Sequence, residues 1–295
     1  MNILITGGTG FIGSELCSHL LTKRHTLVVK SRHPEVVKGN MRGISSLNQL
    51  TAEESFDAVI NLAGEPIADK RWSIAQKKRI SQSRLNTTQE LIEYFNAAAH
   101  KPSLFISGSA IGYYGVGSTD EAVDETGSGD DSFSSSLCAE WEASALQAES
   151  LGIRTCLLRT GIVLGKDGGA LKKMIMPFKL GLGGRMGSGR QWMSWIHLQD
   201  LIGIIDYCIN HETITGPING TAPYPVTNAA FTEALGKALH RPTLLRMPAE
   251  IVRLLMGEMG MELLLAGKFV LPAKIEKAKF KFKYEHLDEA FSDIL

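Results

Sequence analysis

Short continuous apolar runs alternate with longer segments of helical periodicity through the first half of the chain. The runs are rich in Ile, Leu and Val, which is typical of strands buried on both faces of a parallel sheet. Between them, apolar residues recur at the spacing of an amphipathic helix. These patterns predict strands over residues 2–6, 26–30, 57–62, 103–107 and 154–158, and helices over 11–23, 73–99 and 134–150.

The alternation indicates right-handed βαβ crossovers and predicts an α/β fold with a Rossmann-type doubly wound parallel sheet. After residue 165 the pattern changes, and from residue 226 helical patterns interrupted by prolines dominate. Strand, helix and strand are predicted over 192–196, 198–209 and 217–219. We therefore expect a dinucleotide-binding domain over 1–165, with segments of about 190–220 returning to it, and a smaller, mostly helical C-terminal lobe over 166–295.

Composition and charge exclude several classes of protein. The 295 residues include 31 Lys and Arg and 31 Asp and Glu, so no surplus of positive charge favours nucleic acid as a partner. No apolar stretch reaches the roughly 20 residues that cross a bilayer, and the first apolar run is too short for a signal peptide. The four cysteines form no C-x-x-C pair, which predicts neither a disulfide framework nor a metal site. We expect a cytoplasmic protein without a membrane partner.

A glycine-rich sequence follows the first predicted strand and opens the first predicted helix. It has the spacing G-x-x-G-x-x-G, with glycines at 7, 10 and 13. The first glycine permits a tight turn, the second lets a pyrophosphate approach the backbone, and the third lets the helix pack closely on the sheet. The helix N-terminus then faces the phosphates. We assign Gly7, Thr9, Gly10, Phe11, Ile12 and Gly13 to a dinucleotide site; a glycine turn without a ligand is the alternative.

The second predicted strand ends without the carboxylate that usually binds the ribose 2′-hydroxyl of NAD. Ser31 and Arg32 stand there instead and can donate to a 2′-phosphate. We therefore predict NADP(H) as the cofactor, with a solvated basic loop as the alternative. Leu62, Ala63 and Gly64 follow another predicted strand, where small residues would let the chain pass close to the adenosine half of the ligand. An ordinary strand-to-helix turn has the same sequence.

With these motifs, the sequence Ser107-Gly108-Ser109-Ala110-Ile111-Gly112-Tyr113-Tyr114-Gly115 resembles the extended short-chain dehydrogenase/reductase superfamily, which includes nucleotide-sugar epimerases and dehydratases. A closer resemblance is to its atypical "epimerase family protein" subgroup, of the bacterial YfcH type, and spans nearly the whole chain. The resemblance implies a small-molecule substrate and places Val163 near the nicotinamide. The strings that carry it are SRLNTT (83–88), LCAEWE (137–142), RTGIVLG (159–165), SWIH (194–197) with Asp200, and NGTAP (219–223).

The proton relay usual in that superfamily is missing. Members that transfer hydride use a Ser, a Tyr, and a Lys four residues after the Tyr. Ser109 matches the serine, but no tyrosine here has a Lys four positions later, and Ser134 and Cys138 take those two positions. Our candidate catalytic residues are Ser109 and Tyr113. Tyr114 is the alternative to Tyr113, and a structural hydrogen bond is the favoured alternative to catalysis for either tyrosine.

Other polar residues have two interpretations each. We assign Arg84 to the cofactor phosphates or the substrate, with a surface ion pair as the alternative. His197 and Asp200 open a predicted helix, where a cap and a structural pair are favoured over catalysis. Cys138 is interpreted as a packing residue. Residues 181–189, with the arginines in and beside them, are either a site for a phosphorylated or nucleotide-linked substrate or a mobile surface loop.

Two functions remain open. The first is an NADP(H)-binding oxidoreductase or epimerase-like protein that acts on an unidentified small substrate such as a nucleotide sugar. The second is a non-catalytic NADP(H)-binding sensor or regulatory protein, which the missing Tyr–Lys pair favours. We prefer the enzyme, because Trp195 and His197 border the expected site and another acid can serve there.

Residues 115–136, rich in Gly, Ser and Asp, are predicted to form a mobile flap over the cofactor, kept in solvent by their carboxylates. The oligomeric state is not predicted.

Overall fold

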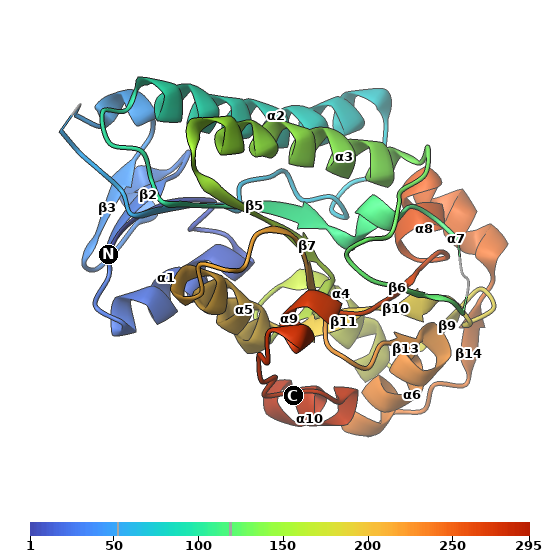
Figure 1. Cartoon of the computed structure of the whole chain (residues 1–295). Coiled ribbons are helices and arrows are strands. Elements are labelled where there is room, and N and C mark those ends of the chain that lie inside the picture. The colour runs from blue at the N-terminus through green and yellow to red at the C-terminus, as the bar shows by residue number, and fades with distance from the viewer. Residues whose placement is uncertain (52, 118–119) are drawn as a thin grey trace.

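A seven-stranded parallel sheet forms the centre of the protein in our computed structural model, which describes residues 1–51, 53–117 and 120–295. Its strand order is β3-β2-β1-β4-β5-β7-β12 (Figure 1). The order reverses between β1 and β4, as in a doubly wound sheet, so the predicted Rossmann-type fold is confirmed. The strands are β1 (Asn2–Thr6), β2 (Thr26–Lys30), β3 (Met41–Ile44), β4 (Ala58–Asn61), β5 (Leu104–Ala110), β7 (Arg154–Thr160) and β12 (Gly216–Gly220).

Helices cover both faces of this sheet. The helices α1 (Phe11–Thr22) and α5 (Leu198–Asn210) lie on one face, and α2 (Ile74–Ala97) and α3 (Phe133–Leu146) lie on the other (Figure 1). Alternate residues of β1 point to opposite faces of the sheet: Ile3 and Ile5 pack with α1 and α5, whereas Leu4 packs with α2. All three are fully buried, which explains why the strand is a continuous apolar run.

The C-terminal half adds helices around a core that includes Trp195, Phe231 and Phe291. The helices are α4 (Gly169–Lys179), α6 (Asn228–Ala238), α7 (Ala249–Met256), α8 (Glu258–Leu263), α9 (Ala273–Lys277) and α10 (Leu287–Ile294). Short strands pair in twos: β8 (Ile162–Leu164) with β11 (Trp195–His197), β10 (Trp192–Met193) with β13 (Val226–Thr227), β9 (Gly184–Met186) with β14 (Leu245–Met247), and β6 (Ala122–Val123) with β15 (Phe269–Val270).

Part of this half returns to the sheet, because β12 is its last strand and α5 packs against α1. The predicted strand over 192–196 is divided between β10 and β11. Neither belongs to the central sheet: β10 pairs with β13, and β11 pairs with β8. A domain division at residue 165 remains a prediction.

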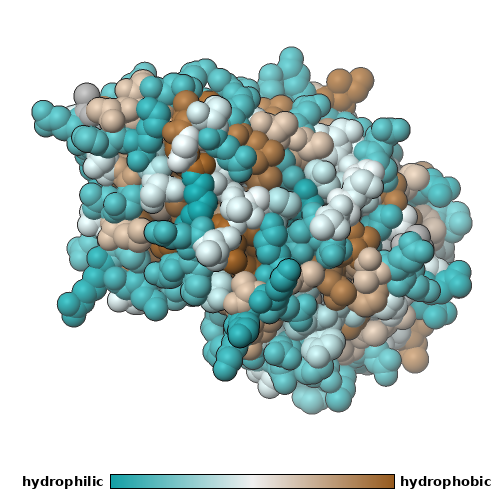
Figure 2. Space-filling view, in the orientation of Figure 1, coloured by the Kyte–Doolittle hydropathy of each residue, from teal (hydrophilic) through white to brown (hydrophobic). Residues whose placement is uncertain are grey.

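The surface seen in Figure 2 is largely hydrophilic, with apolar residues showing in scattered places. Within the described ranges, no helix has the length and apolar character needed to cross a membrane. The same residues contain no group of three or more His, Cys, Asp or Glu that could hold a metal ion.

Residues 115–136 are held by contacts that their composition did not suggest; residues 118 and 119 of this segment lie outside the described residues. The strand β6 pairs with β15, and Asp130 accepts a hydrogen bond from the amide of Val116 at 2.8 Å. Glu125 is only 8% exposed and accepts from the amides of Asn219 and Lys274. The expectation that all the acidic residues here are solvated is therefore wrong for Glu125, and its contacts anchor the middle of the segment.

Candidate functional site

In the glycine loop after β1, Gly7 and Gly13 lie too close to neighbouring backbone for a side chain, whereas Gly10 has space beside it. Gly7 has φ +74°, and a Cβ there would lie 2.6 Å from the carbonyl carbon of Leu62. A Cβ on Gly13 would lie 2.1 Å from the carbonyl oxygen of Gly7, so only glycine lets α1 start this close to the loop. At Gly10 the nearest atom to such a Cβ is 3.3 Å away, and the backbone there is open to a ligand.

The N-terminus of α1 is left without a side-chain cap. Gly10 is the N-cap residue, with φ −83° and ψ 178°, and carries no side chain to accept from the first amides. The backbone N–H groups of a first helical turn have no partner within the helix. Together with the positive end of the helix dipole, they form a site for an anion such as a pyrophosphate.

The side chain of Phe11 joins this helix start to the segment after β8. Its ring lies so close to Gly165 and Gly168 that a Cβ on Gly168 would be 2.3 Å from it. The strand β8 carries Val163, which is half-buried and pairs with Ile196 of β11. The structure thus brings Phe11 and the Val163 segment to the same edge of the sheet as the glycine loop.

A cavity of about 340 Å³ lies between the glycine loop and the end of β2. The hydroxyl oxygens of Thr9 and Ser31 are 3.4 Å apart beside it. Lys38 lines this cavity although it was not predicted as a site residue, whereas Arg32 is exposed and is not among the lining residues. Lys38 lies in an irregular stretch before β3, where no periodicity drew attention to it. The lining residues are Gly8, Thr9, Ser14, Cys17, Val29, Val36, Val37, Lys38 and Met41.

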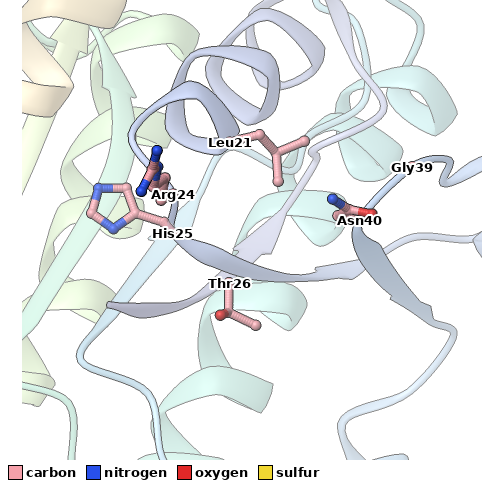
Figure 3. Close-up of a pocket in the computed structure, with 6 residues that line it drawn as sticks. All are labelled: Leu21, Arg24, His25, Thr26, Gly39 and Asn40. Carbon is pink, nitrogen blue, oxygen red and sulfur yellow. The ribbon is translucent and has the colours of Figure 1, made fainter.

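A second pocket, of about 480 Å³, lies at the opposite edge of the sheet (Figure 3). It is lined by Leu21 of α1, by Arg24 and His25 before β2 and Thr26 at its start, and by Gly39 and Asn40 before β3. Ligands of doubly wound folds bind outside the carboxyl ends of the strands, so this pocket does not belong to the glycine-loop site.

Arg84 fixes the segment after β4. Its Nη1 donates to the carbonyl oxygens of Ile80 at 3.0 Å and Glu65 at 3.1 Å, and its guanidinium lies 5.3 Å from the ring of Trp141. A Cβ on Gly64 would be 3.1 Å from the guanidinium carbon, which explains the small residue there. Burial lowers the pKa of Arg84 below its usual value. The surface ion pair considered for Arg84 is therefore wrong, because the residue holds the backbone beside the predicted adenosine contacts.

Ser109 belongs to a buried ion-pair network. Its hydroxyl donates to Glu142 Oε1 at 2.6 Å, and its side chain is almost completely buried. Arg159 makes a two-pronged contact with the same carboxylate, each N–O distance being 2.8 Å. Hydrogen bonds and ionic attraction from Glu142 raise the pKa of Arg159 further above its usual value, despite the opposing effect of burial. The arginine was not singled out as a site residue from the sequence, although it begins the string 159–165.

The two candidate tyrosines have different surroundings. Tyr114 is buried, donates to Asn219 Oδ1 at 2.7 Å, and accepts from Arg159. Burial raises its pKa to about 12, so it has the structural role considered for it. Tyr113 is half-buried, and its ring centroid lies 3.5 Å from the Arg159 guanidinium carbon. Among the described residues, none forms a hydrogen bond with the Tyr113 hydroxyl.

The positions of the missing Tyr and Lys lie on α3. Ser134 donates through its hydroxyl to Glu262 Oε2 at 2.6 Å, and the amides of Phe133 and Ser134 donate to the same carboxylate. Glu262 of α8, from the C-terminal half of the chain, therefore caps the N-terminus of α3. Burial raises the pKa of the Cys138 thiol to about 11, which agrees with a packing role.

His197 is the N-cap residue of α5, as predicted. Its Nδ1 accepts from the amide of Gln199 at 3.1 Å, and Asp200 accepts from the amides of Lys283 and Tyr284. Nε2 lies 3.4 Å from Asp293, but burial outweighs this attraction and lowers the pKa of His197 to about 4. The imidazole is therefore neutral at pH 7.

This shift predicts a loss of stability in acid. The unfolded chain takes up a proton near pH 6.5 and the folded chain only near pH 4, so stability falls as the pH drops through this window. The contribution of His197 is about 2–3 kcal/mol. Urea unfolding at pH 7 and pH 4 should show that His197→Asn, which keeps a capping acceptor, reduces the loss. The same substitution at exposed His33 is the control, and equal acid sensitivity of the two variants would contradict the prediction.

The parallel sheet, the glycine loop and the uncapped helix define a Rossmann-type protein of the dinucleotide-binding class. Comparison with known families makes this specific: residues 3–233 match the NAD dependent epimerase/dehydratase family, and the chain belongs to that family. Residues 247–294 match a domain of unknown function, DUF1731. The resemblance inferred from the sequence is thus confirmed.

Relatives match the chain from end to end. The mouse (Mus musculus) epimerase family protein SDR39U1 is 37% identical, with all of both chains covered. The crystal structure of human SDR39U1 (isoform 2) with NADPH superposes with a TM-score of 0.89 at 34% identity, covering 100% of this chain and 99% of that one. MoeE5, solved with UDP-glucose and NAD, shares the fold at 19% identity and a TM-score of 0.76, covering 99% of this chain and 96% of that one.

Proposed function

We propose that the protein is an NADP(H)-dependent oxidoreductase or epimerase-like enzyme that acts on a small, nucleotide-linked substrate. The observation that carries the proposal is the glycine loop, where the uncapped start of α1 meets the open backbone at Gly10. The NADPH held by the human relative, at 34% identity, supports this choice of cofactor. The buried, unbridged cysteines suit a reducing compartment, and we propose the cytoplasm.

The residues around the loop fit such a cofactor. The first amides of α1, including those of Phe11 and Ile12, would bind the pyrophosphate. Thr9 and Ser31 would donate to the adenosine ribose or its phosphate, with Arg32 and Lys38 supplying positive charge. Leu62, Ala63 and Gly64 would lie along the adenosine half, and Val163 at the nicotinamide half.

The proton donor we propose is Tyr113. The cofactor, when bound, supplies or accepts a hydride, and a protein group must exchange the accompanying proton with the substrate hydroxyl or carbonyl. The Ser109 hydroxyl already donates to Glu142 and is buried, which favours an indirect role in the buried network. Tyr113 keeps its hydroxyl free of partners among the described residues, while Arg159 holds its ring.

A non-catalytic NADP(H)-binding protein is the second candidate. The observation that favours it is the loss of the Tyr–Lys pair, since Ser134 is bonded to Glu262 and Cys138 is buried. Incubating the protein with NADPH, NADP and a panel of nucleotide sugars separates the two functions. A substrate-dependent change in NADPH absorbance supports an oxidoreductase, and conversion of a nucleotide sugar into another sugar nucleotide, followed by chromatography, supports an epimerase, which returns its hydride and leaves the absorbance unchanged. Tight NADPH binding with neither change supports the sensor.

Titration calorimetry should show tighter binding of NADPH than of NADH. A charge-assisted hydrogen bond to the 2′-phosphate contributes about 1.5–3 kcal/mol, so Arg32→Ala or Lys38→Ala should each weaken NADPH binding by roughly tenfold or more. Binding of NADH should change little, because it lacks that phosphate. Lys101→Ala, an exposed change outside the site, is the matched control. Equal affinity of the unaltered protein for NADPH and NADH would contradict the assignment of NADP(H) as the cofactor.

A further inference from the structure

Large apolar side chains stand exposed in two short segments of the C-terminal half. Leu244 is 92% exposed, Leu254 74% and Leu180 68%. A contiguous apolar surface is uncommon on a monomer and marks an interaction site. The remaining members of the set, each at least 40% exposed, are Met176, Leu182, Leu245, Met247, Ile251 and Leu255.

A strand pairing and a side-chain hydrogen bond bring the two segments together. The strands β9 and β14 pair in parallel, with Leu245 opposite Gly184, and Arg241 Nε donates to the carbonyl oxygen of Lys179 at 3.0 Å. The helix α7 begins directly after β14 and Pro248. Figure 1 shows β9, β14 and α7 at the same end of the molecule. We call the surface formed by residues 176–182 and 244–255 the β14–α7 face.

The helix α7 has an unusual distribution of side chains. Val252 is fully buried and supplies the contact with the protein, yet Ile251, Leu254 and Leu255 are exposed. These three positions are spaced by three and four residues, so they lie on one stripe of the helix. A surface helix ordinarily presents polar residues outward, and this apolar stripe is not needed for the core.

The same region carries more basic than acidic residues, in a chain whose total charge is balanced. Residues 169–190 contain five Lys or Arg and no Asp or Glu, and residues 237–258 contain four Lys or Arg and two Glu. Within this set Lys173 is paired with Asp69, and Glu258 is paired with Lys77. A second copy of the chain on this face would bring like charges together, so charge complementarity favours an anionic partner. The basic residues are Lys172, Lys173, Lys179, Arg185, Arg190, Lys237, Arg241, Arg246 and Arg253.

We propose that the β14–α7 face binds the surface of an anionic lipid bilayer. Leu244 and Leu254 protrude enough to enter the boundary between headgroups and acyl chains, while the basic side chains lie at the headgroups. A bilayer accepts protruding apolar side chains without a complementary pocket, which favours it over an acidic protein. The contact is peripheral and needs no membrane-spanning helix. This inference concerns a surface away from the glycine loop and goes beyond the proposed function.

Sedimentation with vesicles tests the proposal on the full chain. Vesicles of phosphatidylcholine with phosphatidylglycerol should carry the protein down, and vesicles of phosphatidylcholine alone should not. High salt should weaken binding, because attraction by exposed basic residues is screened. Leu244→Ser combined with Leu254→Ser should reduce binding at least about tenfold, and Arg241→Gln combined with Arg253→Gln should reduce it by a similar factor.

Leu146→Ser is the matched control, because Leu146 is 37% exposed at the C-terminal end of α3, away from this face. NADPH titration and thermal unfolding show whether each variant remains folded. The proposal is overturned if the unaltered protein does not sediment with the anionic vesicles, or if the leucine variant binds them as well as the control does. Concentration-dependent self-association that the leucine variant abolishes, without vesicle binding, would instead show an interface between copies.

Discussion

Glu142→Gln is expected to lower the free energy of unfolding by about 3–5 kcal/mol, because it removes one partner of a buried ion pair. The guanidinium of Arg159 would keep its charge in a site that is almost fully buried, and the carboxylate that now neutralises it would be gone. Ser109 would lose its charged acceptor as well. Urea denaturation followed by circular dichroism measures the change.

The same helix offers a matched control. Glu140 also lies on α3 but is exposed, so Glu140→Gln should change the free energy of unfolding by less than about 0.5 kcal/mol. The double variant Glu142→Leu with Arg159→Met should be less destabilised than Glu142→Gln alone, since it leaves no buried charge unpaired. If Glu142→Gln unfolds no more easily than Glu140→Gln, the ion pair does not stabilise the fold.

Alanine at Gly10 and at Gly13 should separate cofactor binding from folding. A Cβ on Gly13 meets the Gly7 carbonyl at 2.1 Å, so Gly13→Ala must displace the start of α1 and should cost about 1–3 kcal/mol of stability as well as NADPH affinity. A Cβ on Gly10 meets nothing closer than 3.3 Å. Gly10→Ala should therefore fold normally and lose NADPH binding by roughly a hundredfold, because the methyl group occupies the space of the pyrophosphate.

Thermal unfolding without ligand and calorimetry with NADPH give the two measurements independently. The informative result is the contrast between the variants. Full NADPH affinity in Gly10→Ala would show that the dinucleotide does not approach the loop at this point. Unaltered stability in Gly13→Ala would show that α1 tolerates a wider separation from the loop.

Local sequence predicted the central sheet well because its inner strands are continuous apolar runs. The bounds of β1 and β2 agree with the predicted ranges residue for residue. The edge strand β3 was missed, since Arg42 and Gly43 interrupt its apolar pattern and it pairs on one side only. Edge strands carry fewer buried side chains and so leave a weaker pattern.

The glycine loop was recognisable because its function depends on backbone geometry within seven consecutive residues. The buried network was not, because Glu142 and Tyr114 meet Arg159 across 17 and 45 residues of sequence. Nothing in a local pattern distinguishes Glu125, which is buried, from its solvated neighbours. The basic charge of the β14–α7 face was hidden for the same reason, since two distant segments form it and neither contains a continuous run of like charge.

Because β12 is the last strand of the sheet in sequence, the β7 edge stays uncovered until late in synthesis of the chain. Until residues 216–220 leave the ribosome, β7 is the edge of the sheet, and one row of its backbone amides and carbonyls has no partner strand. Asn219, which accepts from Tyr114 and donates to Glu125, arrives on that same strand. A nascent chain that stalls before this point therefore exposes a ready template for intermolecular pairing, and chaperone binding during translation should concentrate there.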